Sequence, residues 1–139
     1  MKTNSSLSTT PYTLSNMAKR ILIIEDDKIM ARTLRAELSN EGLEVELAFD
    51  GEAGYQMILE QKPDLILLDL LLPRLFGFEL LERLRKHKDR SLAALPVVVI
   101  TNYPEDEYYR KAEALGVKDF VVKSQTSLAE VVALAKKYL

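Results

Sequence analysis

Cysteine is absent from the 139 residues of the sequence. Its absence excludes disulfide bonds, thiolate nucleophiles and zinc–thiolate sites. A chain without cysteine also suits a reducing compartment, so we expect the protein to be cytoplasmic.

Long hydrophobic runs are missing as well. The apolar stretches are no longer than strands and are interrupted by Asp69 or flanked by proline, so none is expected to span a membrane. The polar N-terminus lacks the apolar centre of a signal peptide. We interpret residues 1–18 as a disordered tail or leader, and residues 19–139 as one domain, because this length suits a single core.

An excess of positive charge is also lacking, because 19 Lys and Arg residues face 21 Asp and Glu residues, for a net charge of −2. The chain therefore has no overall basic field that would attract nucleic acid or an anionic membrane. The basic run at residues 83–90 is typical of a solvated helix end. We expect no direct binding of nucleic acid.

Apolar segments of strand length alternate with amphipathic segments of helical spacing from residue 20 onward. The first, third and fourth strands are apolar throughout, as parallel strands covered on both faces are. The pattern predicts a doubly wound α/β sandwich, whose ligand site lies at the carboxyl ends of the strands. The predicted strands cover residues 20–25, 43–49, 65–69, 96–101 and 117–122, and the predicted helices cover residues 27–40, 51–61, 76–88, 104–116 and 126–139.

Polar side chains stand at the ends of four predicted strands. Three acids, residues 25–27, end the first strand, Asp69 ends the third, Thr101 ends the fourth, and Lys123 follows the fifth. Clustered carboxylates need a cation, and an oxygen-only ligand set favours Mg²⁺, with Mn²⁺ as the alternative. A carboxylate beside a metal ion and a lysine can act as a nucleophile on phosphorus, so Asp69 can sit in an apolar run because it points into this cluster. Asp27 is better suited to cap the helix that follows than to bind metal.

Four segments in this order resemble the signatures of the receiver domain of two-component response regulators: "ILIIEDD", "PDLILLDLLLPRLFG", "PVVVIT" and "GVKDFVVKS". The resemblance covers residues 19–139. It implies a flavodoxin-like three-layer (βα)5 sandwich with a parallel five-stranded sheet in the order 2-1-3-4-5.

The same resemblance assigns residue roles by position. Glu25 and Asp26 match the family's acidic pair, with Asp26 as a direct metal ligand, and Asp69 matches the phosphoryl acceptor. The backbone carbonyl of Leu71 would complete the protein's share of the metal shell.

The remaining matches concern the phosphoryl group and the response to it. Lys123 matches the lysine that contacts the phosphoryl group, and Thr101 and Phe120 match the pair that rearranges on phosphorylation. The implied activity is transfer of a phosphoryl group from a phosphohistidine, on a sensor histidine kinase or a phosphotransfer protein, to Asp69. The protein would thus catalyse its own phosphorylation and dephosphorylation without being a conventional turnover enzyme.

Output in such a protein is expected through protein contact, because no further segment follows the last predicted helix. The resemblance places the responding surface at the fourth helix, fifth strand and fifth helix, here residues 105–139, and it allows weak pairing of two copies. The downstream partner is not specified by the sequence.

Four positions depart from the family pattern, and one of them is Phe120, which lacks the hydroxyl that a tyrosine would carry. Ser124 replaces the proline that usually follows the lysine, and a cis bond before a non-proline residue costs about 3 kcal/mol, so we predict a trans bond or a strained cis bond. Asn102 replaces a small residue and is expected to narrow access to the phosphoryl group. Phe76 stands where a small or acidic residue is common.

These departures keep other interpretations open. A degenerate receiver would bind partners independently of phosphorylation, and Asp69 would then be a satisfied buried polar residue. A phosphatase of the haloacid dehalogenase type also uses an aspartate after a strand, but it needs a second acid where this chain has Leu71. A flavodoxin is disfavoured because the first strand leads into acids rather than a hydroxyl-rich phosphate loop.

Overall fold

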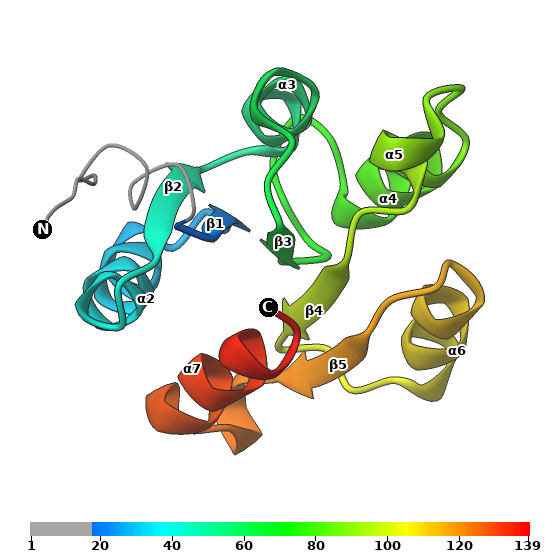
Figure 1. The fold of residues 1–139 in the computed structure, drawn as a ribbon. Helices are drawn as coiled ribbons and strands as arrows, with labels where there is room; N and C mark the ends of the chain where they lie inside the picture. The colour runs from blue at the N-terminus through cyan, green and yellow to red at the C-terminus, as the bar shows by residue number, and fades with distance from the viewer. Residues whose placement is uncertain (1–17) are drawn as a thin grey trace, which may run out of the picture.

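Five parallel strands form one sheet in a computed structural model that describes residues 18–139. The spatial order is β2-β1-β3-β4-β5, as expected (Figure 1). The predicted tail, residues 1–18, lies outside the described residues except for Ala18. The strands are β1 Arg20–Ile24, β2 Glu44–Ala48, β3 Leu65–Leu68, β4 Val97–Thr101 and β5 Asp119–Val122.

Helices cover both faces of this sheet, which confirms the three-layer sandwich (Figure 1). Helices α2 and α7 pack on one face, and α3, α4, α5 and α6 on the other. No helix within residues 18–139 has the length and apolar character needed to cross a bilayer. The helices are α2 Lys28–Asn40, α3 Gly51–Gln61, α4 Gly77–Arg85, α5 Arg90–Ala93, α6 Asp106–Ala114 and α7 Leu128–Lys137.

The all-apolar strands explain why both faces of the sheet are covered. Alternate residues of a strand point to opposite faces, so Ile21 and Ile23 of β1 join the core beneath α2 and α7. Leu22 and Ile24 join the other core, beneath α3 and α4. Every residue of β3 and β4 is buried. The carboxyl ends of these strands therefore form one edge that is fixed by a core on each side.

Capping side chains set several helix ends. Asp27 caps α2 by accepting a hydrogen bond from the Met30 N–H at 3.1 Å, which confirms its predicted role. Ser127 and Glu130 form a capping box at the start of α7, with hydrogen bonds in both directions. Gly42, with a φ of +85°, follows α2 in the left-handed region that closes a helix.

Three predicted helices have clearly different bounds in the structure, and the one predicted over residues 104–116 covers only α6 Asp106–Ala114. The helix predicted over residues 76–88 ends at Arg85, and the short helix α5 follows it, because Asp89 caps a new turn by accepting from the Ser91 N–H at 2.9 Å. The helix predicted over residues 126–139 is shorter because Ser127 caps it, and a 3₁₀ turn, η1 Lys123–Gln125, precedes it. Residues 18–139 contain no cis peptide bond, so the Lys123–Ser124 bond is trans.

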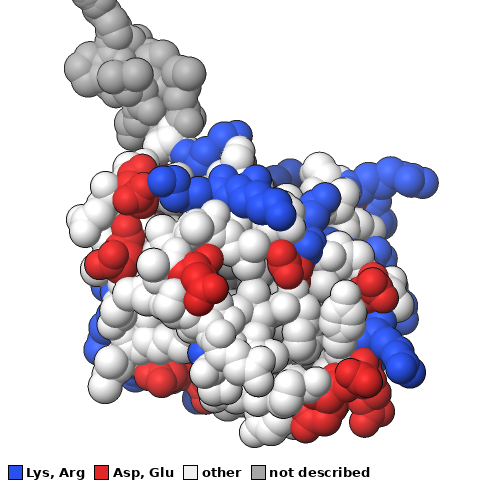
Figure 2. All heavy atoms as spheres, turned by 90° about the horizontal axis from the view of Figure 1, so that it is seen from below, with Lys and Arg blue, Asp and Glu red and all other residues white. Residues whose placement is uncertain are grey.

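Charged side chains of both signs share the face of the molecule seen in Figure 2. Lys and Arg gather along its upper rim, and Asp and Glu are scattered over the rest. This mixture agrees with the small net charge of the chain.

Replacing the capping serine tests the helix boundary that follows the predicted site. We expect Ser127→Ala to lower the free energy of unfolding by about 1 kcal/mol, because the N–H of Glu130 loses its acceptor. Urea unfolding followed by circular dichroism would measure the change. The exposed Ser124, replaced by alanine, is the control, and an equal loss in both variants would contradict the capping role.

The same capping box predicts a dependence of stability on pH. Hydrogen bonds from the backbone and side chain of Ser127 lower the pKa of Glu130 below its ordinary 4.5. The ionised carboxylate therefore stabilises the fold above pH 4.5, and this contribution is lost as the pH falls through the lowered pKa. Wild type should exceed Glu130→Gln in stability at neutral pH and converge with it in acid, as urea unfolding at both pH values would show.

Candidate functional site

Glu25 and Asp26 follow β1 directly, at the carboxyl edge of the sheet. Glu25 is completely buried, and its Oε2 accepts a hydrogen bond from the Asp27 N–H at 3.0 Å. Asp26 is exposed. The chain therefore places one carboxylate inside the sheet edge and the next one at its surface.

Asp69 follows β3, the strand next to β1, and its side chain is 7% exposed. The Leu71 N–H donates to Asp69 Oδ1 at 3.2 Å. The Asp69 N–H donates to the carbonyl of Ile24 at 3.0 Å. This bond to β1 fixes the backbone of the residue that carries the carboxylate.

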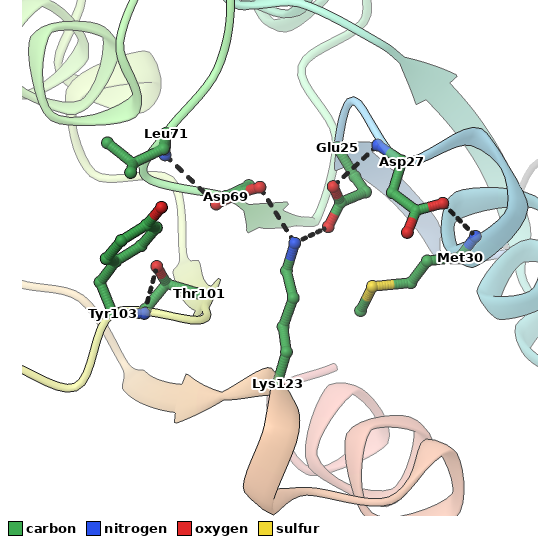
Figure 3. Close-up of polar contacts among 8 residues, drawn as sticks. All are labelled: Glu25, Asp27, Met30, Asp69, Leu71, Thr101, Tyr103 and Lys123. Atoms are coloured by element: carbon green, nitrogen blue, oxygen red, sulfur yellow. Dashed lines mark hydrogen bonds and ion pairs between the residues drawn. The ribbon is translucent and has the colours of Figure 1, made fainter.

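Lys123 supplies the positive charge between these carboxylates (Figure 3). It follows β5, and its Nζ lies 2.5 Å from Glu25 Oε1 and 3.0 Å from Asp69 Oδ2. The lysine side chain is only 14% exposed. Residues distant in the sequence thus meet at one point, as the strand-end pattern predicted.

Burial and charge act against each other at this ion pair. Burial raises the pKa of Glu25 to about 7, and the nearby Asp69 charge adds to the rise, while contact with Lys123 opposes it. Burial alone would lower the pKa of Lys123, but contact with the two carboxylates outweighs it, and the pKa of Lys123 is raised. The ammonium is therefore held in its charged form.

The carboxylates fit a hard divalent cation. Glu25, Asp26 and Asp69 each offer one oxygen, and these oxygens all lie within 4.8 Å of one another. Glu25 Oε1 is buried and accepts no hydrogen bond in suitable geometry, although Lys123 faces it as an ion pair. Oxygen ligands without nitrogen or sulfur suit Mg²⁺ or Mn²⁺. The cluster could therefore hold such an ion.

A cavity of about 260 Å³ opens above this cluster. Asn102 lines it, at the position where narrowed access was expected, and so does Tyr103, which was not predicted at this site. The complete lining is Glu25, Asp26, Asp27, Asp69, Leu71, Asn102, Tyr103 and Lys123.

Thr101 and Phe120, the predicted rearranging pair, do not join the cluster. Thr101 is fully buried at the end of β4, and its Oγ1 accepts a hydrogen bond from the Tyr103 N–H at 3.2 Å. The ring of Phe120 packs edge-on against Tyr109, with 5.6 Å between centroids. The Thr101 oxygen thus contacts the loop that follows β4, and neither Thr101 nor Phe120 lines the cavity above the cluster.

Gly77 is a residue near the site that the sequence reasoning did not single out. Its N–H donates to the Leu70 carbonyl at 2.8 Å, and a Cβ at this position would lie 2.3 Å from the Asp69 carbonyl oxygen. Only glycine allows α4 to start this close to the backbone of Asp69. A glycine near the start of a predicted helix, soon after a buried acid, was the available signal.

Comparison with known proteins gives a consistent result. The model of the response regulator receiver domain family matches residues 21–135. Response regulator ArlR of Staphylococcus saprophyticus is 35% identical over 106 residues, which are 75% of this chain and 45% of that protein. Transcriptional regulatory protein DltR of Streptococcus agalactiae is 36% identical over 106 residues, with the same shares of the two chains.

The matched region is therefore less than half the length of these curated relatives. Among solved structures, the CheY-like response regulator receiver domain protein of Methanospirillum hungatei superposes with a TM-score of 0.78 at 28% identity. That match covers 86% of this chain and 92% of the other. The likeness thus extends over nearly the whole of the solved domain.

Removing the central ammonium tests the electrostatic balance of the cluster. Above pH 7, in EDTA, we expect Lys123→Met to lower the free energy of unfolding by about 3 kcal/mol, because two buried carboxylates lose their counter-charge. Added Mg²⁺ should restore more stability to this variant than to wild type. Urea unfolding with and without Mg²⁺ would measure both effects.

The chain offers a matched control in Lys136, whose Nζ lies 2.5 Å from Glu41 Oε1 but whose side chain is 51% exposed. Lys136→Met should cost only about 0.5 kcal/mol, because solvent screens an exposed pair. Similar losses in the two variants would contradict the importance of burial at Lys123.

Proposed function

The chain belongs to the response regulator receiver domain family, and on this premise we propose that it accepts a phosphoryl group on Asp69 from a phosphohistidine. The donor would be a sensor histidine kinase or a histidine phosphotransfer protein. The observation that carries the proposal is the position of Lys123 Nζ, 3.0 Å from Asp69 Oδ2 and beside the acidic cluster.

The proposed transfer needs a nucleophile that is ready without a general base. A carboxylate is ionised at neutral pH, so an Asp69 oxygen can attack phosphorus directly. The oxygen–phosphorus bond forms as the nitrogen–phosphorus bond breaks, and the histidine leaves as neutral imidazole when its other ring nitrogen carries a proton. The product is an acyl phosphate, which water later hydrolyses.

Charge neutralisation is the main contribution of the surrounding residues in this proposal. Glu25, Asp26, Asp69 and the carbonyl of Leu71 would hold Mg²⁺ or Mn²⁺. A bound ion supplies charge stabilisation for the transferring phosphoryl oxygens. Lys123 would pair with the phosphoryl group in place of the Asp69 oxygen that it now contacts.

The response to phosphorylation is proposed to begin at Thr101. Its hydroxyl would turn toward a phosphoryl oxygen. The hydrogen bond that Thr101 Oγ1 now accepts from the Tyr103 N–H would then break. Phe120, two residues into β5, would move with it as the second member of the switch pair. Both roles rest on the family pattern and on the position of these residues near the edge of the sheet.

Downstream partners are proposed to bind at α6, β5 and α7. A hollow of about 590 Å³ lies along β5 and α7 on this surface, with Phe120, Glu130 and Lys137 among its lining residues. Its lining offers both apolar and charged side chains for contact with a partner protein. Signalling would then proceed through protein contact.

Intact-mass measurement after incubation with acetyl phosphate or phosphoramidate tests the proposal. With Mg²⁺ we expect one added phosphoryl group on wild type and none on Asp69→Asn or in EDTA. Asp64→Asn, at the other end of the same strand, is the matched control, because Asp64 is remote from the cluster and accepts a hydrogen bond from the Arg20 N–H. It should be labelled like wild type.

Absence of labelling on wild type, under conditions that label a control receiver, would contradict the proposal. The alternative is then a binding module that acts independently of phosphorylation. That alternative requires partner binding that is unchanged by Asp69→Ala and by beryllofluoride, a mimic of the phosphoryl group.

A further inference from the structure

We propose that Gly51, at the start of α3, is a positioning residue that holds the loop after Asp69 in a strained turn and so sets the proposed metal site. The loop covers residues 69–76 and connects β3 to α4. The inference rests on the proposed function, because the loop carries Leu71, the proposed carbonyl ligand.

The two ends of this loop are drawn together by a direct backbone contact. The Gly77 N–H donates to the Leu70 carbonyl at 2.8 Å, and the Leu71 N–H donates to Asp69 Oδ1 at 3.2 Å. The first bond holds the end of the loop against Leu70, and the second holds Leu71 against the side chain of Asp69, the proposed phosphoryl acceptor. The outer part of the loop needs a separate support.

A strained turn forms that outer part. The Leu75 N–H donates to the Pro73 carbonyl at 2.8 Å, a bond that spans two residues and defines a γ-turn. Arg74 stands at its centre with a φ of +71°, in the region that residues other than glycine rarely adopt. Such a conformation persists only where the surrounding structure holds it, and it is found most often at functional sites.

Gly51 provides that support from another layer of the fold. Its N–H, at the first turn of α3 where the helix itself offers no acceptor, donates to the same Pro73 carbonyl at 3.1 Å. A Cβ on Gly51 would lie 1.9 Å from the Leu75 carbonyl oxygen and 2.6 Å from Leu75 Cβ. No side chain fits there, because the atom in the way belongs to the loop backbone.

The consequence is that α3 determines where the loop backbone lies, although none of its residues lines the cavity above the acidic cluster. A side chain at position 51 would push the γ-turn outward and carry the Leu71 carbonyl away from the three carboxylates. The proposed ion would then lose one of its protein ligands or hold it in poorer geometry.

Mg²⁺ affinity, measured by calorimetry, tests this inference without any assay of phosphorylation. We expect Gly51→Ala to weaken Mg²⁺ binding about tenfold, as displacement of a ligand's support commonly does. The amide signal of Leu71 in nuclear magnetic resonance spectra should shift in the variant before any Mg²⁺ is added, because its bond to Asp69 is disturbed.

Gly54→Ala is the matched control, since it is the same substitution one turn further along α3. The three atoms nearest to a Cβ at Gly54 all belong to the side chain of Ile24, the closest at 2.7 Å. Its Mg²⁺ affinity should stay near that of wild type even if its stability falls. Equal weakening in both variants, or unchanged affinity in Gly51→Ala, would overturn the inference.

Arg74→Pro covers the case in which Gly51→Ala does not fold. Proline fixes φ at about −65° and cannot adopt the +71° of this position, so the γ-turn would be lost. We expect weaker Mg²⁺ binding, and unchanged affinity would overturn the inference. If wild type itself binds no Mg²⁺ and takes up no phosphoryl group, the proposed function is wrong. If wild type does both and the variants bind Mg²⁺ as wild type does, only the role of Gly51 is wrong.

Discussion

The pairing of Lys123 with two buried carboxylates is the interaction on which the site depends. Glu25 is completely buried and Asp69 nearly so, and charged groups removed from water are costly unless opposite charge compensates them. The ammonium reaches both from the end of β5 and stays protonated because they surround it. The same buried Glu25 carboxylate, whose pKa is raised to about 7, lies with Asp26 and Asp69 in a group whose oxygens are all within 4.8 Å of one another, so the cluster could also hold a metal cation.

The order of the strands brings Glu25, Asp69 and Lys123 together, and close backbone contacts at glycine residues position the loop beside them. Strands β1 and β3 are neighbours, so Glu25 and Asp69 end side by side, and the Asp69 backbone is bonded to Ile24. Gly77 then lets α4 begin against the Asp69 carbonyl, where a side chain would not fit. A rigid core on each face holds the strand ends, while the loop after Asp69 is held by backbone contacts from two helices.

Much of the fold was predictable because its signals are local. The apolar strands, the helical spacing and the Asp27 cap were all evident in the chain, and the all-parallel sheet followed from them. The boundary at Arg85 was missed because the basic residues 85–88 contain no glycine or proline that would mark a helix end, and only the cap at Asp89 starts a new turn. The convergence of the acids with Lys123 was anticipated from strand order, but the orientation of the Thr101 hydroxyl toward Tyr103 was not.

The sequence by itself determined the residue types at the strand ends, and thereby the kind of chemistry available: oxygen ligands, a carboxylate nucleophile and one ammonium. Only the tertiary structure determined the features that depend on the distance between separate segments. These features are the 3.0 Å contact of Lys123 with Asp69, the burial that raises the pKa of Glu25, and the close approach of Gly51 to Leu75. Periodicity reports how one segment meets the core, whereas desolvation and close contact arise only when strands and helices from different parts of the chain pack together.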